Sequence, residues 1–114
     1  MPDPHLPLVR GTLDALVLKA LSWTPMHGFE ITCWIEEHSS DALGLEDGAL
    51  YHALNRLEER RLIKAQWGVT ENNRRARYYS ITAAGRAHLA AETDRWLRYA
   101  EAVTAILTLA PQRR

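Results

Sequence analysis

The spacing of the hydrophobic residues changes twice along this sequence, and these changes restrict the folds that the chain can adopt. Up to residue 61 they recur every three or four positions, as in amphipathic helices. In two short segments between residues 63 and 81 they alternate with other residues, as in strands, and beyond residue 82 the helical spacing returns. The sequence therefore predicts three helices, a hairpin and a further long helix, in this order.

The limits of the first three helices follow from capping and turn residues. Thr12 is a suitable N-cap for the first helix, Thr24-Pro25 closes it, and Asp47 is a suitable N-cap for the third. The second helix is expected from His27 to Glu37, and the residues 39–44 that follow are turn-forming by composition. The predicted buried stripes are Leu13, Leu16, Val17, Ala20 and Leu21 in the first helix, Ile31, Trp34 and Ile35 in the second, and Leu50, Ala53, Leu54 and Leu57 in the third.

The hairpin and the last helix are predicted from their periods. Alternation from Ile63 to Trp67 and from Tyr78 to Ile81 indicates two strands, joined by the polar residues 68–75. Thr82 is the expected N-cap of a long helix that extends to about Ala110. Its residues recur at intervals of seven, which is typical of a helix that pairs with another helix; packing on its own domain is the alternative. The two seams are Leu89, Trp96, Val103 and Ala110, and Thr93, Ala100 and Leu107.

This order of elements is that of a winged helix-turn-helix, in which the third helix enters the DNA major groove and the hairpin contacts the flanking backbone. The expected fold class is mainly α with a small β-hairpin. The 114 residues, 46% of them hydrophobic, suffice for one domain with its own core. We expect residues 1–10 to be a flexible lead-in, 11–82 a DNA-binding winged helix-turn-helix, 83–110 a dimerisation helix and 111–114 a tail.

The charges sum to zero but are unevenly distributed. Residues 1–50 contain two basic and eight acidic side chains, whereas residues 51–86 contain eight basic and three acidic ones. A locally basic segment is what a phosphate-binding surface requires. The composition therefore permits a nucleic-acid partner despite the neutral total.

Enzyme, metal and membrane functions find little support in the sequence. His27, Cys33 and His38 are spaced six and five residues apart, which is no recognised zinc spacing, and no nucleophile and base form a plausible pair. Cys33 is expected to be a thiol of the core. A single cysteine, the lack of a secretory signal in the first residues and the lack of a long apolar run favour a cytoplasmic protein without a cofactor or a membrane partner.

The polar face of the third helix is the first candidate for DNA binding. If its leucines face the core, the opposite side chains are free to reach base edges. Asparagine can pair bidentately with adenine and arginine with guanine, each pair being worth about 1–3 kcal/mol of discrimination. The residues of this face are Tyr51, His52, Asn55, Arg56 and Glu59.

Phosphate contacts are expected from two neighbouring places. Gly48 has no Cβ, so a sugar-phosphate backbone can approach the free amides of Gly48 and Ala49. The hairpin adds polar and basic side chains whose contacts position the protein without reading sequence. The hairpin candidates are Lys64, Asn73, Arg74, Arg75 and Arg77. The alternative is a winged helix that binds another protein, with these side chains merely solvated.

Four blocks of this sequence resemble one known family and keep its order over roughly residues 8–92. They are Leu8-Val9-Arg10-Gly11-Thr12-Leu13-Asp14, Pro25-Met26-His27-Gly28-Phe29-Glu30-Ile31, Gly48-Ala49-Leu50-Tyr51 with Leu54 and Arg56-Leu57-Glu58-Glu59, and Arg77-Tyr78-Tyr79-Ser80-Ile81-Thr82 with Gly85. Together they closely resemble the PadR family of bacterial transcriptional regulators.

The resemblance implies a homodimer formed through the C-terminal helix, and repression of transcription that a small molecule relieves. With one long C-terminal helix the chain is similar to the short subgroup of the family, in which a flat hydrophobic ligand can lie at the dimer interface. Trp96 is then the candidate for stacking on an aromatic effector, and a dimer-core role is its alternative. The residues assigned to this interface are Leu89, Trp96, Ala100, Val103 and Leu107.

Four positions depart from the family pattern. His52 stands where proline is usual, which adds a titratable donor to the third helix. Arg61 stands where glycine commonly ends that helix, at a cost of about 1 kcal/mol if it adopts the left-handed conformation. Ala49 lacks the usual hydroxyl, and Asp47 adds negative charge nearby.

Overall fold

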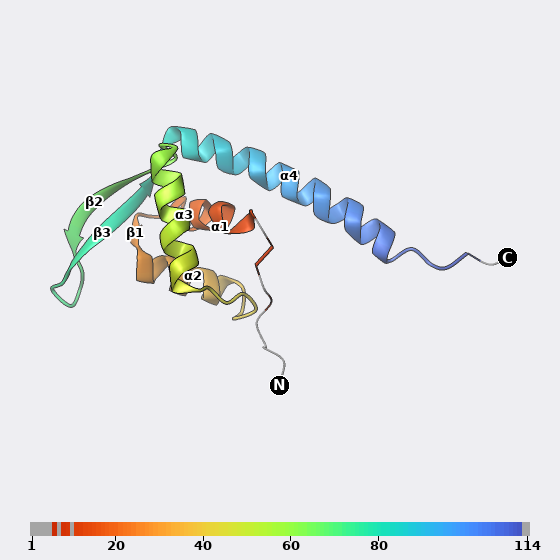
Figure 1. The fold of residues 1–114 in the computed structure, drawn as a ribbon, viewed down its shortest axis with the longest axis horizontal. Coiled ribbons are helices and arrows are strands. Elements are labelled where there is room, and N and C mark those ends of the chain that lie inside the picture. Colours follow the sequence, from red (N-terminus) through yellow and green to blue (C-terminus); the bar gives the residue numbers. More distant parts are fainter. Residues whose placement is uncertain (1–5, 7, 10, 113–114) are drawn as a thin grey trace.

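The computed structural model describes residues 6, 8, 9 and 11–112, without the side chain of Asp47. A helical body carries a hairpin and a long helix that extend from it in different directions (Figure 1). The elements are α1 (Thr12–Leu21), β1 (Met26–His27), α2 (Gly28–His38), α3 (Asp47–Glu59), β2 (Ile63–Val69), β3 (Arg75–Ile81) and α4 (Ala83–Leu107). The predicted order of helices and hairpin strands is confirmed, and the fold is mainly α with a small sheet.

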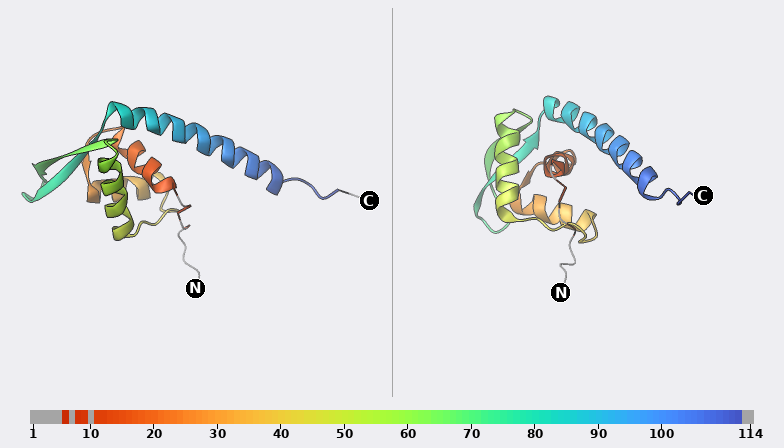
Figure 2. Two further views of the ribbon diagram at one scale, coloured as in Figure 1. Left: turned by 45° about the horizontal axis from the view of Figure 1, so that its top comes forward. Right: turned by 45° about the vertical axis from the view of Figure 1, so that its right-hand side comes forward.

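Helix α1 lies at the centre of the body. It packs against α2, α3 and α4, which surround it in the right-hand view of Figure 2. In this central place Val17, Leu18 and Ala20 of α1 are fully buried. The buried core consists of Leu13, Val17, Leu18, Ala20, Leu21, Met26, Ile31, Ile35, Leu50, Ala53, Leu54, Leu57, Leu62, Ile63 and Tyr79.

The sheet contains a third strand that the sequence did not reveal. β1 pairs antiparallel with β3, with Met26 opposite Tyr79, and β3 pairs antiparallel with β2, so the order is β1-β3-β2. Two residues are too few to show alternation. This short strand ties the connection between α1 and α2 to the base of the hairpin.

Several predicted helix ends are wrong by a few residues. The N-cap of α1 is Gly11 and not Thr12, whose hydroxyl instead donates to the Val9 carbonyl at 2.6 Å. Likewise α3 is preceded by Glu46, so Asp47 is its first residue rather than its cap. At the far end of the chain α4 stops at Leu107, short of Ala110.

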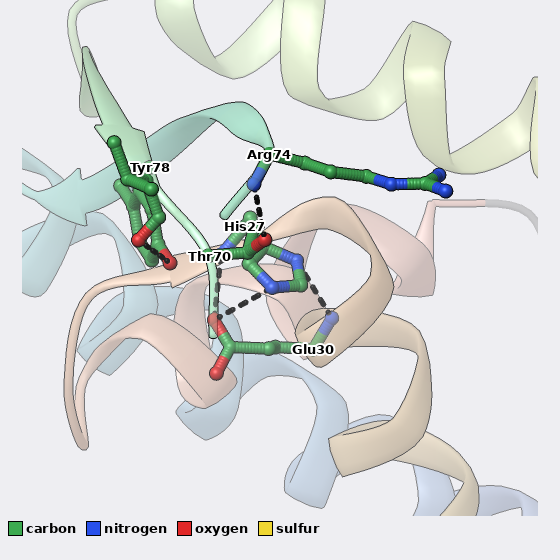
Figure 3. A network of polar contacts seen from close by, with 6 residues as sticks. His27, Glu30, Thr70, Arg74 and Tyr78 are labelled. Carbon is green, nitrogen blue, oxygen red and sulfur yellow. Dashed lines mark hydrogen bonds and ion pairs between the residues drawn. The ribbon is translucent and has the colours of Figure 1, made fainter. Parts of the chain in front are cut away.

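Two other helix starts have side-chain caps. The Thr82 hydroxyl accepts the Gly85 N–H at 3.0 Å, which confirms the predicted cap of α4. His27 is the cap of α2 rather than its first residue: its Nδ1 accepts the Glu30 N–H at 3.4 Å, and the Glu30 carboxylate accepts the His27 N–H at 3.1 Å (Figure 3). This reciprocal pair is a capping box.

Helix α3 ends with Arg61 in the left-handed conformation, which is unfavourable for a residue other than glycine. Arg61 has a φ of 60°, and the N–H groups of Arg61 and Leu62 donate back to the carbonyls of Glu58 and Leu57 at 3.0 Å each. This is the Schellman arrangement, in which glycine normally holds the left-handed position. The departure noted in the sequence therefore falls on a position with positive φ.

The N-terminal segment is attached to the body at the positions that are described. The Leu6 N–H donates to the Ala42 carbonyl at 2.7 Å, Leu6 bridges to Leu43, and Leu8 packs against the core. At these positions the segment predicted as a lead-in contacts the body. Residues 1–5, 7 and 10 of that lead-in, and residues 113–114 of the predicted tail, lie outside the described residues.

Cys33 is half-buried and outside the core, so the predicted core thiol is wrong. It follows the buried Ile31 by two positions, which places it on the flank of α2. Within the described residues no group of three or more histidine, cysteine or acidic side chains could hold a metal ion. None of the described helices, the 25-residue α4 included, is apolar enough over its length to cross a membrane.

Candidate nucleic-acid interface

One face of α3 is turned away from the core. The leucines of the helix are buried, as predicted, and the opposite side carries Tyr51, 63% exposed, and the exposed His52. Their rings meet edge to face with centroids 5.7 Å apart. Asn55 lies one turn further and is half-buried. These three side chains form a surface that a base edge or a phosphate can approach.

The first turn of α3 is open to a backbone. A Cβ built on Gly48 would meet no atom within 4 Å, and Gly48 is exposed. The Glu46 side chain makes no capping hydrogen bond, so the amides of this turn have no side-chain cap. Ala49, in contrast, is half-buried against the core and contributes to this surface only through its backbone.

Arg56 is held by α1 rather than free on the reading face. Its Nη2 lies 2.6 Å from Oδ1 of Asp14 and its Nε 3.4 Å from Oδ2, a two-pronged contact between α3 and α1. The hydrogen bond to Asp14 raises the pKa of Arg56. A guanine contact by Arg56 would therefore require its guanidinium to leave Asp14.

The hairpin has two different faces, because paired residues of antiparallel strands point to the same side. Trp67 lies opposite Arg77 and Val69 opposite Arg75, so these residues share one face. Lys64 lies opposite Ser80 on the other face. The predicted hairpin cations are thus divided: Arg75 and Arg77 lie on one side and Lys64 on the other.

Arg77 joins the hairpin to α3. Its Nη2 lies 2.8 Å from Oε2 of Glu58, and its guanidinium lies 5.7 Å from the centre of the Tyr79 ring. Burial raises the pKa of Tyr79, while the charge of Arg77 acts in the opposite direction. The face that carries Arg75 is therefore continuous with the surface of α3.

The end of the hairpin presents Asn73 and Arg74. Asn73 has a φ of 60°, a conformation that asparagine tolerates, and its N–H donates to the Thr70 carbonyl at 2.9 Å. The Arg74 N–H donates to the Thr70 hydroxyl at 3.2 Å, and the Arg74 side chain extends away from this contact (Figure 3). Both residues are exposed, as phosphate contacts must be.

The residues predicted for an effector or dimer interface are spread along α4. Leu89 is half-buried against the core of its own domain, Trp96 is 44% exposed, and Leu107 is 77% exposed. Ala100 and Val103 are half-buried. Toward its C-terminal end α4 extends beyond the helical body (Figure 1). Large apolar side chains of this part, Ile106 and Leu107, are exposed.

A groove of about 930 Å³ lies between the N-terminal segment, α1 and α4. Its walls are mostly apolar and include Leu8, Leu16 and Leu89, and Trp96 and Tyr99 of α4 also line it. Of the predicted interface residues it brings together only Leu89 and Trp96. Ala100, Val103 and Leu107 lie further along α4, outside the groove.

A model of the family described as "Transcriptional regulator PadR-like family" matches residues 17–91 of this chain. The chain belongs to the PadR family. PadR proteins are transcriptional regulators, so this chain is a DNA-binding transcriptional regulator.

The chain is also similar to individual proteins and solved structures. This PadR chain is 27% identical over 96 residues to uncharacterized protein X of Lysinibacillus sphaericus, covering 84% of this chain and 88% of that protein. It is similar to the structure of a transcriptional regulator from Clostridium thermocellum, with a TM-score of 0.76, 27% identity and coverage of 83% and 92% of the two chains. A PadR-family regulator from Clostridium difficile gives a TM-score of 0.74, 26% identity and coverage of 85% and 99%.

The sequence did not predict the carboxylates that hold the PadR regulator's arginines, or the exposure of Trp67. No role is predicted for Asp14 and Glu58 from the sequence, because nothing in their spacing points to partners on other elements. Trp67 continues the alternation that begins at Ile63 and that predicted a strand, and it is 58% exposed.

Proposed function

We propose that this PadR protein is a homodimeric repressor that binds an inverted-repeat operator and is released by a small hydrophobic or aromatic effector. The observation that carries the proposal is the Glu58–Arg77 contact of 2.8 Å, because it joins α3 to the hairpin. The exposed Tyr51 and the arginine face of the hairpin thereby form one surface. Such a surface fits a major groove and the backbone beside it.

The dimer is supported by α4. Its apolar side chains have no cover where the helix leaves the body: Ile106 is 73% and Leu107 77% exposed. Apolar surface of this kind in a long helix favours association with a second helix. Two copies of α3 would then enter successive major grooves about 34–36 Å apart, so an inverted repeat is the expected operator.

The effector would lie against Trp96 at the dimer interface. An aromatic ring that is partly exposed beside an apolar groove can stack on a planar ligand. Such a ligand would release DNA by favouring a dimer with wrongly spaced α3 helices, and only its differential affinity for the two states counts. Trp96→Ala should lower the affinity for the ligand or the stability of the dimer. Titration of planar aromatic compounds by tryptophan quenching, with sedimentation mass, checks both; unchanged values would refute both roles.

Salt dependence tests the DNA interface. The logarithm of the affinity for duplex DNA should fall with the logarithm of the salt concentration by about 0.9 per phosphate contacted, and Arg74→Ala should reduce that slope by about one. Arg98→Ala is the matched control, since Arg98 lies on α4 and pairs with Asp94. An equal slope in the Arg74 variant would remove this end of the hairpin from the interface. A flat profile in the unmodified protein would favour a protein-binding module.

A further inference from the structure

Trp67 lies in an unusual place for the largest apolar side chain. It belongs to the face of β2 that begins with the buried Ile63, but it lies further out on the hairpin, beyond the body, and is 58% exposed. Val69, the next residue of this face, is 61% exposed. An exposed indole on a strand contributes little to the core, so its position calls for another explanation.

The indole is in contact with one of the arginines assigned to DNA. The Arg75 guanidinium carbon lies 4.7 Å from the centre of the Trp67 ring, a cation–π arrangement. Arg77 on the same face is held by Glu58, whereas Arg75 has no carboxylate partner among the described side chains, those of residues 6, 8, 9, 11–46 and 48–112. Among these side chains the indole of Trp67 is the group in contact with the Arg75 guanidinium.

We propose that Trp67 is a positioning residue for DNA binding, which holds Arg75 ready for a backbone phosphate. A guanidinium has five N–H donors, and the cation–π contact with the indole uses none of them in a conventional hydrogen bond, so N–H groups remain available for a two-pronged contact with phosphate oxygens. Holding the side chain before binding lowers the conformational entropy lost in the complex. This inference rests on the proposed DNA-binding function and adds to it a residue that makes no charged contact itself.

A double-mutant cycle on the full-length protein tests this role. Affinity for one fluorescent duplex, taken from the operator or any duplex that the protein binds, is measured for Trp67→Ala, Arg75→Ala and the double variant. Trp67→Ala should weaken binding by about threefold to tenfold, the range expected for one side chain that must be ordered on binding. In the Arg75→Ala background the same substitution should have little effect. Trp67→Phe, which keeps a weaker cation–π face, should restore part of the affinity.

Matched controls separate positioning from general damage. In the Arg74→Ala background Trp67→Ala should retain its full effect, because the cation–π contact of the indole is made with Arg75. The salt slope should fall by about 0.9 in Arg75→Ala, since a phosphate contact is lost, and should stay nearly constant in Trp67→Ala. The thermal midpoint of Trp67→Ala should equal that of the unmodified protein, because the side chain is exposed.

The outcomes are distinguishable. If the unmodified protein binds DNA but the effects of Trp67→Ala and Arg75→Ala add, or if Trp67→Ala leaves the affinity unchanged, the positioning role is overturned while the regulator function stands. If the unmodified protein binds no duplex at all, the proposed function fails, and the positioning role with it.

Discussion

At the scale of single residues, Arg61 holds a backbone conformation that glycine adopts without strain. Its φ of 60° closes α3 through two hydrogen bonds to preceding carbonyls. Arg61→Gly should raise the free energy of unfolding by about 1 kcal/mol, because the left-handed conformation penalises a Cβ. Urea denaturation measures the change. Arg60→Gly, at a residue with a φ of −81°, is the control and should bring no gain. An unchanged midpoint for Arg61→Gly would show that the position is unstrained.

Substitution of Gly48 should change the stability of the protein and its affinity for DNA in opposite directions. Open space surrounds the position of its absent Cβ, so Gly48→Ala should stabilise the first turn of α3 by about 0.5–1 kcal/mol through helix propensity. If a sugar-phosphate backbone approaches this turn, the added methyl group should at the same time weaken DNA binding. Thermal denaturation and binding of the same preparation check both signs. A more stable variant with unaltered affinity would place this turn away from the DNA.

At the scale of elements, the base of the hairpin should respond to alkaline pH through Tyr79. Burial raises the pKa of Tyr79 above 10.0, so the folded state holds its proton more tightly than the unfolded chain. The resulting stability is present below pH 10 and is lost as the pH rises through about 10 toward the raised value. When the urea midpoint is measured at a series of pH values, Tyr79→Phe should reduce its decline at alkaline pH. Tyr99→Phe should leave this decline unchanged. A decline unaffected by Tyr79→Phe would assign it to another group.

The elements also show what the sequence could and could not predict. The stripes of α1 and α3 and the cap at Thr82 follow from local rules of spacing and capping, and they were predicted. β1, the Arg56–Asp14 pair and the Arg77–Glu58 pair join residues far apart in sequence, and no local pattern marks such partners. The hairpin extends further than its apolar alternation because backbone hydrogen bonds between strands need no particular side chain. The candidate site was therefore predicted as a set of residues but not as an arrangement.

At the scale of the whole molecule, the exposed end of α4 should control assembly. Leu107 is 77% exposed in the single chain, so a charge there costs the isolated domain little. If it lies in a helix–helix seam, Leu107→Glu should convert the dimer to a monomer in sedimentation at equal concentration. Thr104→Glu, an exposed α4 position outside the two predicted seams, is the control. A dimer that survives Leu107→Glu would place the interface elsewhere on the molecule.

Assembly and DNA recognition are linked, because two copies of α3 define the spacing of the half-sites. Asn55→Ala should relax the choice at one base pair in each half-site, through the loss of a contact to a base. Arg75→Ala should lower the affinity for all DNA sequences alike, because a phosphate contact is lost. Selection with both variants separates these two effects. Equal sequence profiles for Asn55→Ala and the unmodified protein would remove Asn55 from base recognition.

The most direct test of the regulator function is selection of bound duplexes from a random DNA pool at about physiological salt, together with the sedimentation mass of the protein. The proposed function predicts an enriched inverted repeat, with half-sites about one helical turn apart, bound by a dimer. A single asymmetric site would contradict the symmetric dimer. Weak binding common to all sequences, with no enrichment, would contradict sequence-specific recognition by α3.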